Sequence, residues 1–190
     1  MRNTILSLGP VLLTVTLSAQ GVFSNKTQSV LEKVIQDYPN HFYNIKGELI
    51  SQAVQTARYR STVQLPGASS STVTVCTAAR NEGAGWTCVV LEADSFARAK
   101  AKFAEIYSQL SNSIVTLAAQ KTYILTGQYE EPLAGKKVTR VVFSLLPGVG
   151  DMKKLKVELA LCDEGKTWKI VLIVQDLEPR DEIAGAPPAL

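Results

Sequence analysis

The sequence is poor in the residues that build metal and catalytic sites. It has a single histidine, His41, and three cysteines, none of them in CxxC spacing, which argues against a zinc site built from several histidines or paired cysteines. It also lacks a GxSxG elbow, a P-loop and a GxGxxG loop, the motifs of many hydrolases and nucleotide-binding proteins. We therefore predict no catalytic, cofactor-binding or metal-binding residues and favour a non-enzyme.

Neither basic nor acidic residues are in large excess. The chain has 20 basic and 17 acidic residues and a net charge of +3, so no nucleic-acid partner is expected. The 46% hydrophobic content is that of a folded protein. The length suffices for a domain with a substantial hydrophobic core.

Long apolar runs are confined to the N-terminus. After Met1-Arg2-Asn3, residues 4–17 are uncharged and mostly apolar, and small or polar residues follow at 18–21. This run is shorter than the roughly 20 apolar residues that a membrane-spanning helix needs. The pattern predicts a secretory signal peptide over 1–20, cleaved near Ala19 or Gln20, and the alternative is an N-terminal membrane anchor. We expect a secreted or periplasmic protein without a transmembrane segment after cleavage.

One pattern occurs twice in the chain. The stretches 65–94 and 146–176 both begin with Leu-Pro-Gly, and both carry Glu-Gly followed by a tryptophan, Trp86 or Trp168. A repeat of this kind indicates an internal duplication. We expect residues 21–94 and 95–176 to form two repeats, followed by a mobile tail over 177–190 that shows no apolar periodicity.

Each repeat is expected to be one helix followed by four strands. Ser29 and Glu32 fit a capping box that starts the first helix, which ends before Pro39. Asp94-Ser95 caps the second helix, whose apolar residues recur at intervals of three and four up to Ile114. The expected strands are 42–49, 58–65, 72–79 and 85–91, then 122–129, 138–145, 155–161 and 168–174, with glycines marking close approaches or bulges at Gly47 and Gly127.

The predicted fold class is therefore α+β, with tandem duplicated αββββ units, antiparallel sheets and a helix packed on each. The two sheets could join edge to edge into one eight-stranded sheet, or stand as half-domains with a cleft between them. The element order of each half is similar to that of cystatin-like αββββ folds. The pair of halves resembles the secreted tandem-repeat inhibitors of β-lactamases, which implies a concave surface and no particular site residue.

Strand register decides the state of the cysteines. In the second hairpin, pairing Leu161 with Trp168 keeps the alternating apolar residues on one face. The same register in the first hairpin buries Cys88 and turns Cys76 outward. A three-residue turn ending at Gly83 would instead place Cys76 opposite Cys88, so the sequence leaves a Cys76–Cys88 disulfide open.

A few residues are weak candidates for chemistry. His41 could be a general base, and Glu92 with Asp94, or Glu130 with Glu131, could be an acid–base pair. A loop histidine, a helix cap and exposed loop carboxylates are the structural alternatives, and we favour them.

Two further groups of residues suggest binding. The second half carries clustered basic residues that could form a patch for an acidic partner or act as solvated edge lysines. The two tryptophans could stack on a ligand or anchor the core, and their repetition favours the core. The basic residues are Lys136, Lys137, Arg140, Lys153, Lys154 and Lys156.

The missing motifs and the expected concave sheet favour an exported non-catalytic binding or interaction protein, with an unknown protein or small molecule as its ligand. An exported enzyme with a site of scattered residues such as His41, Glu92 and Asp94 is the first alternative. A structural envelope-associated module or a secreted protein inhibitor is the second.

Overall fold

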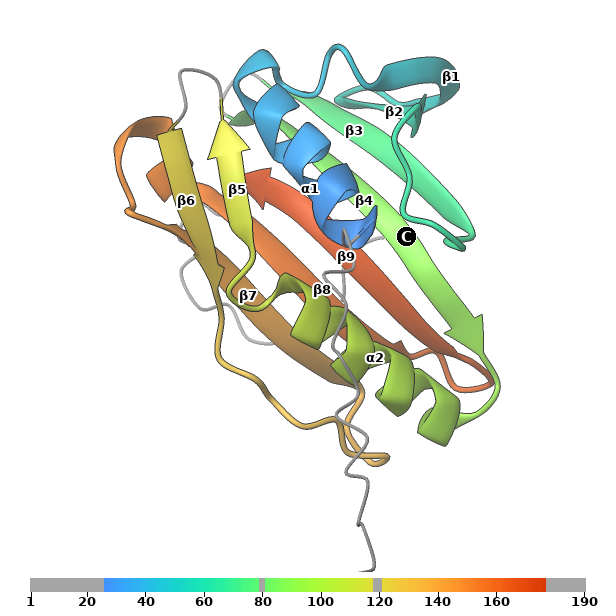
Figure 1. The fold of residues 1–190 in the computed structure, drawn as a ribbon. Helices are drawn as coiled ribbons and strands as arrows, with labels where there is room; N and C mark the ends of the chain where they lie inside the picture. Colours follow the sequence, from blue (N-terminus) through green and yellow to red (C-terminus); the bar gives the residue numbers. More distant parts are fainter. Residues whose placement is uncertain (1–25, 79–80, 118–120, 177–190) are drawn as a thin grey trace, which may run out of the picture.

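A computed structural model describes residues 26–78, 81–117 and 121–176. These residues form a single antiparallel sheet of nine strands in the order β1-β2-β3-β4-β9-β8-β7-β6-β5. Both helices lie on the same side of this curved sheet (Figure 1). The helical segments are α1 (Lys26–Asp37), α2 (Phe96–Leu110) and the 3-10 helices η1 (Tyr38–Asn40) and η3 (Gly150–Lys153). The strands are β1 (Lys46–Gln52), β2 (Thr56–Ser61), β3 (Ser70–Ala78), β4 (Asn81–Ala93), β5 (Ile114–Leu117), β6 (Lys121–Thr126), β7 (Val138–Leu146), β8 (Leu155–Asp163) and β9 (Trp168–Asp176).

The predicted fold class, tandem αββββ units with a cystatin-like topology in each half, is wrong. The nine strands form one continuous sheet, and five strands rather than four follow α2. Helix α1 is hydrogen-bonded to β5, which follows α2 in the chain. The first helix therefore does not pack on the first four strands alone. The sheet is also not the eight-stranded alternative, because β5 adds a ninth strand at its edge.

The residues that suggested duplication lie in unlike surroundings. Trp86 is fully buried, and its indole N–H donates to Ser61 Oγ at 3.0 Å and to Val63 O at 3.2 Å. Trp168 is only partly buried and packs against Phe96, with ring centroids 4.8 Å apart. The two Leu-Pro-Gly stretches differ as well, since the first leucine is buried and the second is half exposed. Similar local sequence therefore does not produce equivalent environments.

The helix boundaries correct two predictions. Helix α1 begins at Lys26, so Ser29 is not its N-cap, and the Glu32 carboxylate accepts a hydrogen bond from the Thr116 N–H at 2.8 Å instead of completing a capping box. Ser95 caps α2 by accepting from the Arg98 N–H, as the sequence predicts, whereas Asp94 does not. Helix α2 ends at Leu110, and the expected last turn is replaced by the turn into β5.

Both hairpins are shifted in register by comparison with the prediction. Leu161 pairs with Ile170 rather than Trp168, and the first hairpin turns earlier, so that Cys76 pairs with Gly83 and Cys88 with Ser71. The shift is two residues in the second hairpin and six in the first, where Trp86 pairs with Val73. Both shifts are even, so every side chain keeps its predicted face, and Cys88 and Leu161 are buried as expected. Cys76 and Cys88 are both free cysteines, so the structure has no disulfide between them.

The hydrophobic core lies between the two helices and the inner face of the sheet. Gly127, directly after β6, lets the backbone pass close to Phe143 of β7, because a Cβ atom there would lie 2.7 Å from the Phe143 ring. The largest fully buried side chains of the core are Trp86, Phe42, Phe103, Phe143, Leu31, Ile35, Leu110, Leu125, Leu145, Leu155, Leu159 and Leu161.

The expected signal peptide over 1–20 and the tail over 177–190 lie outside the described residues. Within the described ranges, neither helix combines the length and the apolar character required to cross a membrane.

Candidate functional site

Helix α1 is held against the sheet edge that forms one wall of a pocket. Gln28 Nε2 donates to the Ile114 carbonyl at 2.8 Å, and Gln36 Nε2 donates to the Thr116 carbonyl at 3.0 Å. Glu32 accepts from the Thr116 N–H. The three α1 side chains are spaced by four residues and share one helix face. They bring the end of α1 to the end of β5.

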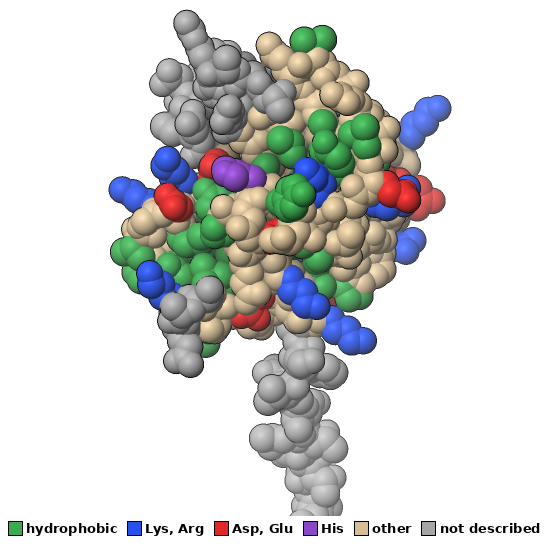
Figure 2. All heavy atoms as spheres, turned by 90° about the horizontal axis from the view of Figure 1, so that it is seen from above, with side chains coloured by type: hydrophobic (Ala, Val, Ile, Leu, Met, Phe, Trp, Pro, Cys, Tyr) green, Lys and Arg blue, Asp and Glu red, His purple; other side chains and the backbone are tan. Residues whose placement is uncertain are grey.

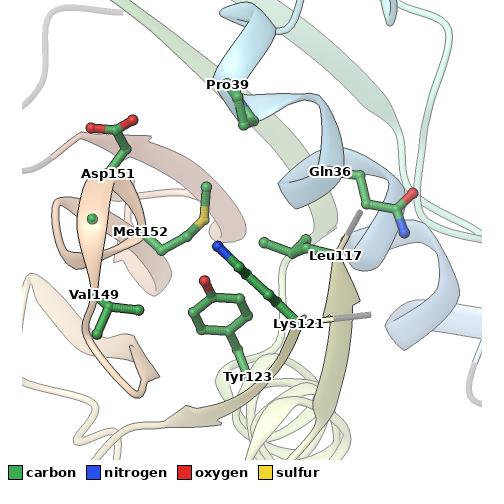
Figure 3. A pocket seen from close by; sticks show the side chains of 9 residues that line it. Gln36, Pro39, Leu117, Lys121, Tyr123, Val149, Asp151 and Met152 are labelled. Carbon is green, nitrogen blue, oxygen red and sulfur yellow. The ribbon is translucent and has the colours of Figure 1, made fainter. Parts of the chain in front are cut away.

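The pocket opens where α1 ends, between β5, β6 and η3. Its volume is about 410 Å³, within the range of small-molecule sites. Figure 2 looks down on the end of the molecule that carries His41 and shows hydrophobic side chains gathered beside that histidine, with charged side chains between them. The lining residues are Gln36, Pro39, Leu117, Lys121, Tyr123, Val149, Gly150, Asp151 and Met152 (Figure 3).

Two polar groups and a thioether converge in this pocket. The Lys121 ammonium group, the Tyr123 hydroxyl and the Met152 sulfur point toward the same space, whereas the Asp151 carboxylate points away from it (Figure 3). Among the described residues, no carboxylate forms an ion pair with Lys121, and no hydrogen bond satisfies the Tyr123 hydroxyl. The pocket therefore offers one cation and one hydroxyl between apolar walls.

A tyrosine hydrogen bond fixes the end of α1 beside the pocket. The Tyr38 hydroxyl donates to the Asp176 carboxylate at the end of β9. Burial, this hydrogen bond and the negative charges of Asp176 and Asp151 together raise the pKa of Tyr38 well above its usual range. The hydroxyl therefore keeps its proton at neutral pH and serves as a structural donor rather than a general base.

The residues considered for acid–base chemistry do not come together. His41 is exposed where η1 ends, and Glu92 and Asp94 lie at the far end of β4, next to the start of α2 (Figure 1). Glu92 lies 3.6 Å from the Lys169 ammonium group. Within the described part of the chain, no hydrogen bond joins His41 to a carboxylate.

The second carboxylate pair is occupied by lysines. Glu130 forms an ion pair with Lys136, and Glu131 forms one with Lys100 at 2.6 Å. Both ion pairs are exposed, and their geometry is that of loop anchors rather than of an acid–base couple.

The basic residues of the second half separate into two groups. Carboxylates neutralise Lys136, Lys137 and Arg140, the last through Glu158 at 2.6 Å. Lys153, Lys154 and Lys156 have no carboxylate partner among the described residues. The predicted patch is therefore reduced to three lysines around the start of β8.

Two of the three cysteines, Cys88 and Cys162, are poor nucleophiles. Burial raises the pKa of the Cys88 thiol and that of the Cys162 thiol, so both stay protonated near neutral pH. In the described ranges, no three histidine, cysteine, aspartate or glutamate side chains are grouped so that they could hold a metal ion.

Lys121, Tyr123 and Met152 are not among the site residues predicted from the sequence. One signal was available, because Lys121, Tyr123 and Leu125 alternate along β6 and therefore share a face. Tyr123 and Leu125 are buried, so the lysine stands at the end of a core-facing row. Met152 carries no comparable signal, since η3 approaches β6 only through the tertiary fold.

Comparisons with known proteins give this pocket no precedent. No protein-family model, no curated protein and no solved structure matches the chain.

Proposed function

We propose that the protein is an exported, non-catalytic binding protein whose pocket takes a small organic anion with an apolar body. The observation that supports this most directly is the pairing of the Lys121 ammonium group with apolar walls in one open pocket. Ligand sites commonly combine mostly apolar linings with a few converging polar groups.

Each wall has a distinct part in the proposed complex. Lys121 and the Tyr123 hydroxyl donate hydrogen bonds to the anionic head. Leu117 and Met152 contact the apolar body, and the flexible thioether of Met152 adapts to its shape. The Asp151 carboxylate points away from the space, so it does not repel an anion held at Lys121.

Two probes of equal chain length test this proposal. Octanoate carries a carboxylate, and octanol carries a neutral hydroxyl on the same apolar chain. Titration of each probe, followed by NMR of the Met152 methyl group and the Tyr123 ring, should shift both signals. Octanoate should bind about fivefold more tightly than octanol, which corresponds to about 1 kcal/mol for a partly exposed ion pair.

Substitution separates the charge from the apolar contacts. Lys121→Gln should abolish the preference for octanoate and leave octanol binding unchanged, whereas Met152→Ala should weaken both. Lys33→Gln is the matched control, because Lys33 is an exposed lysine of α1 outside the pocket. The proposal is wrong if neither pocket signal shifts, or if Lys121→Gln leaves the preference intact.

A further inference from the structure

Three large aliphatic side chains stand in direct register on the outer face of the sheet. Ile114 of β5 pairs with Ile124 of β6, and Ile124 pairs with Leu146 of β7. Their exposed fractions are 54%, 45% and 50%. Isolated exposed aliphatic residues are ordinary, but adjacent ones mark an interaction site. We call these three residues the aliphatic row.

Only the face of this region is open, because its edge is covered. The α1 side chains Gln28, Glu32 and Gln36 bond to the main chain of β5 on its free side. A partner strand therefore cannot pair with β5 while α1 is in place. Whatever contacts the aliphatic row therefore approaches the outer face of β5–β7.

Three lysines without carboxylate partners border the row. Ser144 of β7 pairs with Lys156, and Lys153 and Lys154 directly precede β8. The Lys156 ammonium group donates to Ser144 Oγ at 2.9 Å and to the Lys153 carbonyl at 3.3 Å. The nearest carboxylates in sequence are Asp151, two residues before Lys153, and Glu158, two residues after Lys156. Glu158 forms an ion pair with Arg140, so the three lysines outnumber the remaining carboxylate and the corner is net positive. This net positive charge favours an anionic partner.

The composition of this corner distinguishes a lipid from a protein partner. Protein interfaces are enriched in aromatic residues and arginine and depleted in lysine. The corner instead combines isoleucine, leucine and lysine on the outer face of the sheet. Aliphatic side chains that enter a bilayer interface, bordered by lysines that attract anionic headgroups, are the composition of a peripheral membrane surface.

We propose that the aliphatic row and Lys153, Lys154 and Lys156 form a docking surface for an anionic lipid bilayer. The aliphatic side chains enter the headgroup region, and the ammonium groups lie at the level of the lipid phosphates. This proposal does not rest on the proposed function, because the inner-face pocket and the outer-face row are separate sites.

Vesicle co-sedimentation tests the proposal. The purified protein should bind vesicles of phosphatidylglycerol and phosphatidylcholine, and should not bind vesicles of phosphatidylcholine alone. The triple variant Ile114→Thr, Ile124→Thr, Leu146→Thr should weaken binding by about tenfold or more. Threonine suits an outward strand position. If the triple variant does not fold, Ile124→Thr alone provides the same test with a smaller effect.

Charge and control variants complete the experiment. Lys153→Gln with Lys154→Gln should weaken binding by about fivefold for each lysine, and added salt should do the same. Val54→Thr, at an exposed site between β1 and β2, and Lys166→Gln should leave binding unchanged. The proposal is overturned if the protein ignores anionic vesicles or if the triple variant binds them equally well. It is also overturned if the row instead drives self-association, seen as a concentration-dependent dimer that the triple variant loses.

Discussion

The two edge strands of the sheet, β5 and β1, are both reached by α1 but are protected differently. At β5, side chains of α1 replace a missing strand. The alternation of an antiparallel ladder leaves the main-chain groups of Ile114 and Thr116 on the free side. Gln28, Glu32 and Gln36 satisfy three of those groups. The helix thus removes the template for edge-to-edge pairing.

At β1 the end of α1 positions the strand without covering it. The Asp37 carboxylate accepts hydrogen bonds from the N–H groups of Asn44 and Ile45, which lead into β1. The strand itself is mostly exposed and has two register shifts against β2. Bulges and charged residues discourage pairing at an edge. One edge is therefore closed by a helix, and the other is protected by its own irregularity.

The largest expected effect comes from removing the anchor of β1. Asp37 is buried, and Asp37→Ala leaves the N–H groups of Asn44 and Ile45 without their acceptor. We expect the free energy of unfolding to fall by about 3 kcal/mol, measured by urea denaturation. Amide exchange should accelerate in β1 and not in β5. Asp37→Asn, which keeps one acceptor oxygen, should cost less, and equal losses for the two variants would contradict this account.

Opening the covered edge should have the next largest effect. The triple variant Gln28→Ala, Glu32→Ala, Gln36→Ala removes three exposed hydrogen bonds to β5 and should lower the free energy of unfolding by about 1–2 kcal/mol. Exchange of the Thr116 amide should accelerate, and the protein should self-associate through the freed edge. Ser29→Ala with Lys33→Ala, on the same helix, is the control. An unchanged Thr116 exchange rate would show that α1 does not protect this edge.

The hydrogen bond between Tyr38 and Asp176, which fixes the end of α1, can be tested through pH. Tyr38→Phe removes the hydrogen bond to Asp176 and should cost about 1 kcal/mol. Because the pKa of Tyr38 is raised, the folded protein keeps this proton above about pH 10, where unfolded tyrosine loses it. The free energy of unfolding should therefore fall as pH rises above about 10, and Tyr38→Phe should lack this contribution.

Unfolding measured from about pH 8 to pH 11 compares the two proteins over that window. Tyr43→Phe makes the same substitution at an exposed tyrosine and should keep the wild-type slope. Identical slopes for Tyr38→Phe and the wild type would refute the assignment.

The smallest effect is expected at the lysine of the open edge. The Lys46 ammonium group lies 4.7 Å from the Tyr43 ring centroid and 4.6 Å from that of Tyr59. Lys46→Gln should lower the free energy of unfolding by about 0.5 kcal/mol. A double-mutant cycle with Tyr59→Leu measures the coupling, and a coupling energy of zero would remove this contact from the protection of β1.

The prediction of α2 shows where local pattern suffices and where it stops. Ser95 is a helix cap because its hydroxyl serves the adjacent backbone, and sequence alone identifies it. Ile114 fits the same helical stripe at four-residue spacing, yet it begins β5. The Leu125 N–H donates to the Ser113 carbonyl and the Asn112 N–H to the Leu125 carbonyl. Pairing with a distant strand therefore outweighs the helical period.

Only one residue of the candidate site left a signal in the sequence. Lys121 stands in an alternating row with Tyr123 and Leu125, so a lysine on a core-facing side could have been recognised. The approach of η3 and of the end of α1 to that lysine depends on contacts between remote segments. The separation of Met152 and Lys121 along the chain does not indicate that the two residues are neighbours.

By itself, the sequence determined which side chains face the core. The strand period of two residues preserves that division when the register shifts by an even number, as it does by two residues at Leu161 and by six at Cys88. Only the tertiary structure decided that β4 pairs with β9, that α1 covers β5, and that Trp86 and Trp168 lie in different environments. Those outcomes depend on which backbone groups and apolar surfaces remain unsatisfied after local structure forms. Residues far apart in the chain supply the partners, and no local pattern encodes them.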